Sequence, residues 1–357
     1  MHCKAFISGC AGLSLSSDER VFFANERPFG LILFARNFSS PAQVRELVAQ
    51  FRCAVGWHAP VFVDQEGGRV QRLGPPLWAD YPAAGTVAQV WQHSQGDGVK
   101  AVSLFAEALG LELAGMGLSA NCIPCLDVPV AGANDIIGLR AFGGDAQMVA
   151  QLGAAVIDGC RKAHIYPVIK HMPGHGRAMV DSHKQLPRLA CSLDEMRASD
   201  FVPFQALNDS PFGMTAHVVV EALDDARPAT QSPVVVSQII RGEIGFSGLL
   251  MSDDLSMMAL DGDIRTRIRG VFAAGVDMAL HCNGEFSDMQ AAVLEVPELA
   301  DNALVRAKAS LEFVKAPLAQ EEAQARLPQR RAALNDLLGR YGLQQVRLPD
   351  VRQGMIV

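Results

Sequence analysis

Residues 166–176 read YPVIKHMPGHG: an apolar run, then a lysine and a histidine, then a loop that contains glycine and proline. The run 166–169 is short and bounded by turn-forming residues, which is typical of a buried strand. Titratable side chains follow at the point where this strand would end. Repetition of this arrangement along the chain indicates the fold class.

Eight short apolar runs alternate with segments that carry apolar residues at helical spacing. The strand candidates are 5–9, 30–34, 60–63, 118–123, 166–169, 211–215, 248–251 and 277–280. The helix candidates are 41–55, 98–116, 146–163, 193–206, 233–244, 263–274 and 285–296. Buried strands alternating with helices predict a parallel sheet, and eight units predict an α/β protein with a (β/α)8 TIM-type barrel. A doubly wound open sheet is the competing arrangement.

Length and composition fit one large domain. The chain has 357 residues, of which 49% are hydrophobic and 19% charged. This length suits either two average domains or one large barrel. Beyond residue 316, Gln, Glu, Arg and Ala become frequent, which predicts an added amphipathic helix and then a loose tail. We therefore expect a barrel domain over residues 1–315 and a C-terminal helix and tail over 316–357.

Charge and hydropathy exclude several classes of partner. The net charge is −7 and there is no basic run, which argues against nucleic acid or an anionic membrane as the main partner. No window approaches the roughly 18 apolar residues of a membrane helix, and the apolar stretch before Cys10 is too short for a signal peptide. The eight cysteines are scattered, and the CxxC spacing of Cys122 and Cys125 lacks a second pair, so we expect buried thiols in a cytoplasmic protein.

Polar residues gather where the predicted strands end, which is where a barrel carries its active site. These positions are Asp64, Asp127, Lys170 with His171, His217, Asp253 with Asp254, and His281. Any one of them could instead cap a helix, as we expect of Asp254. An acid, lysine or histidine at all six positions is harder to explain by capping alone.

The segment 170–183 holds the densest cluster, with three histidines and Asp181. A metal site is a minor alternative, because Pro173 and Gly174 disfavour the helix on which His171 and His175 would share a face. Asp181 and His183 lie two residues apart, so they project to one side of an extended loop. An aspartate beside a histidine raises its basicity, which suits a general acid/base couple, although a pair of exposed loop residues would look the same.

Two further patterns allow other interpretations. Lys170 at a strand end could form a Schiff base if desolvation lowered its pKa, although the neighbouring carboxylates favour a charged, hydrogen-bonding lysine. The segment 115–120, GMGLSA, partly imitates a dinucleotide-binding fingerprint, but it precedes a strand where the fingerprint must follow one.

Five segments together resemble the signatures of glycoside hydrolase family 3. They are DQEGGRVQR at 64–72, RAFG at 140–143, KHMPGHG at 170–176, DSH at 181–183 and SDDLSM at 252–257. The chain is most similar to the single-domain bacterial β-N-acetylhexosaminidases of that family, which act in peptidoglycan recycling. Their fold is a TIM barrel, in agreement with the strand count.

The resemblance implies a role for each matching residue. Asp253 would be the nucleophile that forms a covalent glycosyl-enzyme intermediate, and His183, held by Asp181, would be the acid/base. The residues that would bind the sugar hydroxyls are Asp64, Arg72, Arg140, Lys170 and His171. No metal and no cofactor are implied. Ala141, Met172 and Arg177 depart from the commonest family pattern without replacing a reacting group.

The implied function is that of a retaining exo-β-N-acetylglucosaminidase that removes terminal GlcNAc from GlcNAc-1,6-anhydroMurNAc muropeptides. Three Trp and three Tyr are few for a cleft that binds a polymer, and they suit a pocket for one terminal sugar. We expect a monomer acting on this small-molecule substrate. A Schiff-base aldolase using Lys170 and a non-catalytic sugar-binding protein are the alternatives.

Overall fold

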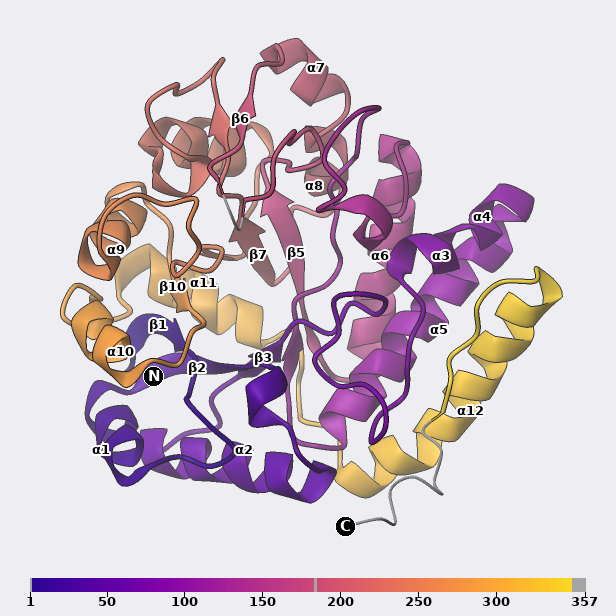
Figure 1. The fold of residues 1–357 in the computed structure, drawn as a ribbon, viewed down its shortest axis with the longest axis horizontal. Coiled ribbons are helices and arrows are strands. Elements are labelled where there is room, and N and C mark those ends of the chain that lie inside the picture. The colour runs from indigo at the N-terminus through magenta and orange to yellow at the C-terminus, as the bar shows by residue number, and fades with distance from the viewer. Residues whose placement is uncertain (1, 183–184, 349–357) are drawn as a thin grey trace.

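The computed structural model describes residues 2–182 and 185–348. Within these ranges, eight parallel strands form one sheet that curls into a barrel surrounded by helices (Figure 1). The strands are β1 (Lys4–Ser8), β2 (Pro28–Leu33), β3 (Val61–Val63), β4 (Ala120–Asn121), β5 (Tyr166–Met172), β7 (Phe212–Thr215), β9 (Leu249–Met251) and β10 (Ala279–His281). Each overlaps one predicted strand, so the (β/α)8 prediction is confirmed and the open sheet is not found.

The barrel closes between β10 and β9, the two strands at the ends of the sheet order. The strand order is β10-β1-β2-β3-β4-β5-β7-β9, and β9 meets β10 through a single bridge between Met251 and Met278. The Ser252 amide donates to the Met278 carbonyl at 2.9 Å, and the Leu280 amide donates to the Ser252 hydroxyl at 3.0 Å. The Ser252 hydroxyl therefore adds a side-chain hydrogen bond to the backbone contact between these two strands.

Helices cover the outside of the barrel. The longer ones are α1 (Ser17–Glu26), α2 (Pro41–Val55), α5 (Gln95–Ala114), α6 (Ala146–Lys162), α7 (Leu193–Ala198), α8 (Phe201–Ala206), η4 (Val235–Glu243), α9 (Ile264–Ala273), α10 (Phe286–Val293) and α11 (Asp301–Leu311). Shorter elements are η1 (Ala35–Asn37), α3 (Ala84–Ala88), α4 (Val90–His93), η2 (Gly138–Arg140), η3 (Ala229–Gln231) and the paired β6 (Arg188–Leu189) and β8 (Val219–Val220). Helices α1 and α11 were not among the predicted segments.

Two predicted helices differ in detail from the structure. The segment 193–206 is divided into α7 and α8, because Ser199 leaves the helical conformation at φ −136° and ψ −74°. The next residue, Asp200, is fully buried and accepts a hydrogen bond from Arg177 Nε at 2.7 Å. The segment 233–244 contains a π-helix, whose wider hydrogen-bond spacing a hydrophobic period does not reveal.

The expectation that Asp254 caps a helix is wrong. Its Oδ1 accepts from the amides of Ser256 and Cys282, each at 3.0 Å, so it closes a local turn and links the end of β9 to the end of β10. Helix α9 begins only at Ile264, and Asp263 is its cap, accepting from the Thr266 amide at 2.8 Å.

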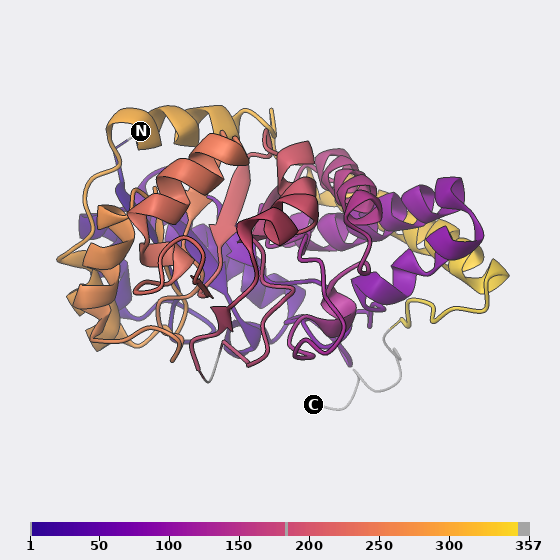
Figure 2. The same ribbon diagram turned by 90° about the horizontal axis from the view of Figure 1, so that it is seen from above.

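The predicted additional helix is α12 (Gln320–Arg340), which lies alongside α5 at one side of the molecule (Figures 1 and 2). Leu334, Leu337 and Leu338 are fully buried in the main hydrophobic core. Two arginines of α12, Arg326 and Arg330, reach Glu107 of α5 at 2.9 and 2.8 Å. The boundary at residue 315 stays a prediction, and residues 349–357 of the predicted tail lie outside the described ranges.

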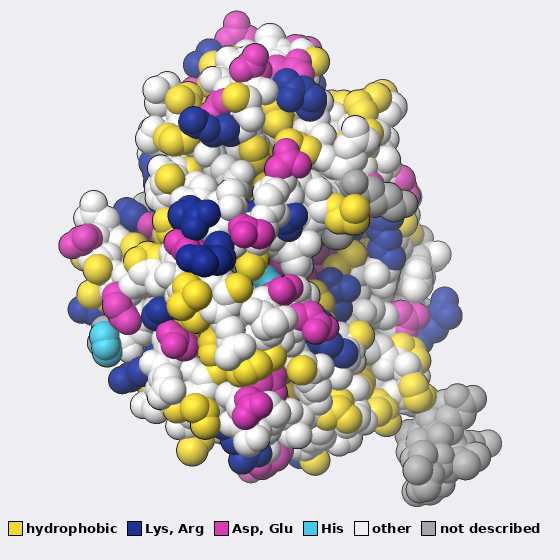
Figure 3. Space-filling view, turned by 60° about the vertical axis from the view of Figure 1, so that its left-hand side comes forward, with side chains coloured by type: hydrophobic (Ala, Val, Ile, Leu, Met, Phe, Trp, Pro, Cys, Tyr) yellow, Lys and Arg dark blue, Asp and Glu magenta, His cyan; other side chains and the backbone are white. Residues whose placement is uncertain are grey.

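The surface carries both signs of charge. Figure 3 shows Lys and Arg side chains intermingled with Asp and Glu over one face of the molecule. In the part of the chain that the structure describes, none of the helices combines the length and the apolar character that crossing a bilayer requires.

Candidate active site

A cavity of about 280 Å³ opens at the carboxyl ends of the barrel strands. Six of the eight predicted site residues line it: Asp64, Arg72, Arg140, Lys170, His171 and Asp253. Lys170 and His171 come from the end of β5 and the others from loops after other strands, which is how a barrel assembles a site from distant parts of the sequence. Other lining side chains include Phe34, Glu66, Arg69 and Ser182.

Lys170 stands at the centre of a buried ionic network. This residue of β5 is only 2% exposed, and its Nζ lies 3.1 Å from Asp64 Oδ1 and 2.5 Å from Glu66 Oε1. Burial alone would lower the pKa of Lys170, but the two carboxylates outweigh it and raise the pKa above its ordinary value. The lysine is therefore a fixed cation, which is the opposite of what Schiff-base chemistry requires.

Two arginines complete this network. Arg72 Nη2 lies 3.2 Å from Asp64 Oδ2, and Arg140 holds Glu66 through Nε at 2.8 Å and Nη2 at 2.9 Å. Burial opposes ionisation of Glu66, but Arg140 and Lys170 overcome it and lower the pKa of Glu66 to about 2. The pKa of Asp64 is likewise held well below its usual range. The cavity wall thus presents fixed charges and hydrogen-bond groups, which suit sugar hydroxyls.

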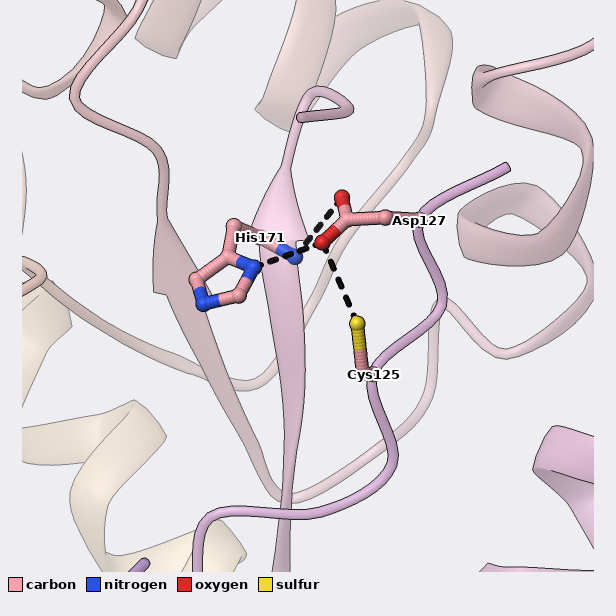
Figure 4. Close-up of side chains that lie close together, drawn as sticks. All are labelled: Cys125, Asp127 and His171. Carbon is pink, nitrogen blue, oxygen red and sulfur yellow. Dashed lines mark hydrogen bonds and ion pairs between the residues drawn. The ribbon is translucent and has the colours of Figure 1, made fainter. Parts of the chain in front are cut away.

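Asp127 orients His171 (Figure 4). Its Oδ2 lies 2.6 Å from His171 Nδ1, and its Oδ1 accepts from the backbone amides of His171 at 3.3 Å and His175 at 2.7 Å. Cys125 Sγ donates to the same carboxylate at 3.2 Å. The bond to Nδ1 fixes the orientation of the ring, and Figure 4 shows the other ring nitrogen pointing away from Asp127.

Cys125, Asp127 and His171 also have the spacing of metal ligands, since one potential ligand atom of each lies within 4.8 Å of the others. The carboxylate between them already accepts from two backbone amides, a thiol and an imidazole. These contacts explain the cluster as a support for His171 without any ion.

Asp253 follows β9 and lines the cavity. Its Oδ1 accepts from the Asp254 amide at 2.8 Å. Burial raises the pKa of Asp253, but His217, His171 and that amide together lower it below the ordinary value. His217 is fully buried, and its Nε2 lies 3.0 Å from the Asp254 carbonyl, so it also supports the backbone beside Asp253. The carboxylate is therefore ionised at neutral pH.

The predicted acid/base couple is only partly described. Asp181 is half-buried next to Ser182, which lines the cavity, whereas His183 lies outside the described residues. The preceding part of this loop is anchored by Arg177, whose Nε lies 2.7 Å from Asp200 between α7 and α8. The loop therefore runs from β5 along the rim of the cavity.

Three residues of the site were not chosen from the sequence: Glu66, Asp127 and His217. Asp127 and His217 stood among the strand-end residues, and Glu66 lies in the quoted segment 64–72. The sequence signal available for them was their position, at a strand end for Asp127 and His217 and within the segment 64–72 for Glu66. What the sequence did not reveal is that each acts on another site residue, namely Lys170, His171 and the backbone at Asp254.

Comparison with known proteins identifies the family. A model of the glycosyl hydrolase family 3 N-terminal domain matches residues 13–311. The chain belongs to glycosyl hydrolase family 3. Two relatives are named β-hexosaminidase. That of Pseudomonas aeruginosa is 40% identical over 283 residues (77% of this chain and 81% of that protein), and that of Alkalilimnicola ehrlichii is 37% identical over 279 residues (77% of this chain and 79% of that protein).

The barrel also matches solved structures of this family. The crystal structure of NagZ from Neisseria gonorrhoeae in complex with N-trifluoroacetyl-D-glucosamine superposes with a TM-score of 0.85 and 30% identity. The match covers 95% of this chain and 98% of that chain. This family 3 chain is a glycoside hydrolase of the β-N-acetylhexosaminidase type.

Proposed function

We propose that this family 3 chain is a retaining exo-β-N-acetylglucosaminidase that removes the terminal GlcNAc from GlcNAc-1,6-anhydroMurNAc muropeptides. The observation that carries the proposal is the ionised Asp253 in a cavity whose wall holds Asp64, Lys170 and Glu66 as fixed charges. The NagZ structure with a GlcNAc derivative supports the choice of sugar.

The shape of the cavity supports exo action. Its volume of about 280 Å³ lies near the lower end of small-molecule pockets, which run from about 300 to 1,000 Å³. Among the described lining residues, Phe34 is the one aromatic ring besides histidines, and Arg72 lies 5.0 Å from its centre. A site for one terminal sugar needs no row of aromatic platforms.

In the proposed first step, Asp253 attacks the anomeric carbon and the glycosidic C–O bond breaks. The Asp254 amide holds Oδ1, which leaves Oδ2 as the attacking oxygen. His183, paired with Asp181, donates its proton to the leaving oxygen. In the second step His183 removes a proton from water, and the water displaces Asp253 from the sugar, so the β configuration is retained. Asp64, Arg72, Arg140, Lys170 and His171 bind the sugar hydroxyls throughout.

The nucleophile is tested with an aryl N-acetylglucosaminide. Asp253→Ala is expected to lose nearly all turnover, and a slow fluorinated glycoside is expected to label Asp253, as read by peptide mass spectrometry. Asp261→Ala, at an exposed carboxylate of the same loop, is the matched control and keeps wild-type turnover. Labelling of Asp254 or Glu66 would overturn the assignment.

The acid/base role is tested by varying the leaving group. Truncation of His183 should cost roughly 10²–10⁴-fold on substrates with poor leaving groups, the usual contribution of general acid catalysis. An activated aryl leaving group needs no proton, so its cleavage should suffer less. Equal losses of turnover on both substrates would contradict the acid role of His183.

Substrate choice is tested by comparing turnover of the N-acetylglucosaminide, glucoside and xyloside, and then of the anhydro disaccharide with and without its peptide. Preference for the N-acetyl sugar supports the proposal. Absence of all turnover would favour the sugar-binding alternative. Trapping of an adduct by borohydride would favour the aldolase, which the charged Lys170 argues against.

A further inference from the structure

His217 connects two parts of the barrel beside the active site. It follows β7, it is fully buried, and both of its ring nitrogens have partners. Nδ1 lies 2.8 Å from the Thr230 hydroxyl, and Nε2 lies 3.0 Å from the Asp254 carbonyl. The ring therefore links η3, which contains Thr230, to the backbone that follows Asp253.

The contact with Asp254 fixes which ring nitrogen of His217 carries the proton. A carbonyl oxygen can only accept a hydrogen bond, so Nε2 must donate. Burial lowers the pKa of His217 below its ordinary value, although the nearby Asp253 carboxylate acts to raise it, so the ring is neutral near pH 7. A neutral imidazole that donates from Nε2 can only accept at Nδ1.

The Thr230 hydroxyl is therefore the donor to His217 Nδ1. This hydroxyl also lies 3.0 Å from the Ala216 carbonyl and 2.8 Å from the Thr215 hydroxyl, but it has a single proton to donate. The contact with Nδ1 is shorter than that with the carbonyl, and without a proton two lone pairs would face each other there. Thr215 must then donate to Thr230, so the three hydrogen bonds run in one direction and end at Asp254.

Asp254 in turn orients the proposed nucleophile. Its backbone amide donates to Asp253 Oδ1 at 2.8 Å, and its carbonyl accepts from His217. Its carboxylate accepts from the amides of Ser256 and Cys282. The amide, carbonyl and carboxylate of Asp254 are thus all held, and the direction of the Asp253 carboxylate depends on how well they are held.

We propose that Thr230 is a positioning residue for the glycosidase reaction. Its hydroxyl keeps His217 in the form that donates from Nε2, and this bond fixes the Asp254 backbone that aims Asp253 at the anomeric carbon. The inference rests on the proposed function, in which Asp253 is the nucleophile. Because Thr230 is fully buried and acts through His217, it affects the rate of attack more than the binding of the sugar.

The test compares Thr230→Val, which removes the hydroxyl at nearly constant size, with Thr230→Ser, which keeps it. For Thr230→Val we expect kcat/KM on an aryl N-acetylglucosaminide to fall about tenfold, the order expected for one lost hydrogen bond. The Kd of N-acetylglucosamine, measured by calorimetry, should stay close to that of the wild type, because the groups that bind the sugar are unchanged. Thr230→Ser should restore most of kcat/KM.

Ser310→Ala is the matched control, because the buried Ser310 hydroxyl contacts the same two strands at their other end. It donates to the Pro211 carbonyl, just before β7, and accepts from the Leu249 amide at the start of β9. Ser310→Ala should lower the Tm but keep the kcat/KM of the wild type. An equal loss of kcat/KM in Thr230→Val and Ser310→Ala would indicate a merely structural role and overturn the proposal.

Nitrogen NMR of the wild type tests the direction of the hydrogen bonds without any substitution, so it decides the matter even if Thr230→Val does not fold. The His217 ring should carry its proton on Nε2 at neutral pH, with Nδ1 accepting a hydrogen bond. A proton on Nδ1 would overturn the proposal. Labelling of a carboxylate other than Asp253 would overturn the proposed function, whereas an unchanged kcat/KM in Thr230→Val, with Asp253 labelled, would overturn this inference alone.

Discussion

At the scale of single residues, the ionic network around Lys170 makes the active-site wall rigid. Glu66 is the link between Lys170 and Arg140, and all three side chains are nearly buried. Removing the Glu66 carboxylate leaves the Lys170 and Arg140 cations facing each other. Asp64 is then the one remaining acid that contacts the lysine. Loss of one partner from a buried pair typically costs about 3–5 kcal/mol.

We therefore expect Glu66→Gln to lower the free energy of unfolding by about 3 kcal/mol and to weaken substrate binding. Urea denaturation and KM for the aryl glycoside measure the two effects. Arg69→Gln is the control for the effect on stability, because the Arg69–Asp135 pair is exposed and worth less than about 1 kcal/mol. Equal effects of both substitutions would contradict the network.

The pH dependence of this effect has a definite sign. The pKa of Glu66 is lowered in the folded protein from 4.5 to about 2, so its contribution is present above the unfolded value. It is lost as pH falls from about 4.5 through the folded value. The stability difference between wild type and Glu66→Gln should therefore stay constant near neutral pH and shrink in acid. A difference that grows as pH falls would show that the sign is wrong.

The positions of strand-end residues at the cavity were easier to predict than the contacts between them. Lys170, His171 and Asp253 could be chosen because each follows an apolar run. The contact between Asp127 and His171 could not be predicted, because the sequence between them does not show how their side chains meet in space. Asp254 shows the same limit: a cap and a turn-closing carboxylate look alike in sequence.

At the scale of elements, an ion pair is one of the contacts that anchor the loop after β5. Arg177 Nε lies 2.7 Å from Asp200, which is fully buried at the break between α7 and α8. Gly174, in the same loop, passes so close that an added Cβ would lie 2.8 Å from Asp200 Cβ. The pair therefore fixes the stretch that leads to Asp181 and the proposed acid His183.

Arg177→Gln should lower turnover most on substrates with poor leaving groups, since these need the acid on this loop. Steady-state kinetics on a series of aryl leaving groups measures the effect. Arg188→Gln is the control, because its pair with Glu221 at 2.7 Å is exposed and lies on β6. A loss that is uniform across leaving groups would indicate a merely structural role.

The elements themselves were largely predictable. All eight barrel strands and the helix 41–55 follow from apolar runs and helical spacing, because buried parallel strands and amphipathic helices carry those patterns. The break at Ser199 and the π-helix Val235–Glu243 do not, since both keep the helical spacing of apolar residues. The break at Ser199 coincides with a tertiary contact, because the next residue, Asp200, is buried and accepts from Arg177, whereas the π-helix is a wider local hydrogen-bond pattern.

At the scale of the whole molecule, helix α12 is part of the core. Leu334, Leu337 and Leu338 are fully buried, and each buried leucine contributes about 1.5–3 kcal/mol. A chain ending at residue 316 should therefore lose on the order of 5 kcal/mol or more and unfold at a much lower temperature. Circular dichroism melting checks this, with a chain ending at residue 348 as the control. A stable chain ending at 316 would show that the barrel folds without α12.

Closure of the barrel has a consequence for its motions. Strands β9 and β10 share one bridge, and beside it the amides of Leu280 and Cys282 donate to the side chains of Ser252 and Asp254, on either side of Asp253. Hydrogen bonds to side-chain acceptors break more easily than a continuous backbone ladder, so the amide protons of Leu280 and Cys282 should exchange with deuterium sooner than that of Val168, which donates to the Ile123 carbonyl at 2.9 Å. Asp253, the proposed nucleophile, would then lie where the barrel opens first, and a ligand that binds Asp253 would slow exchange of these amide protons.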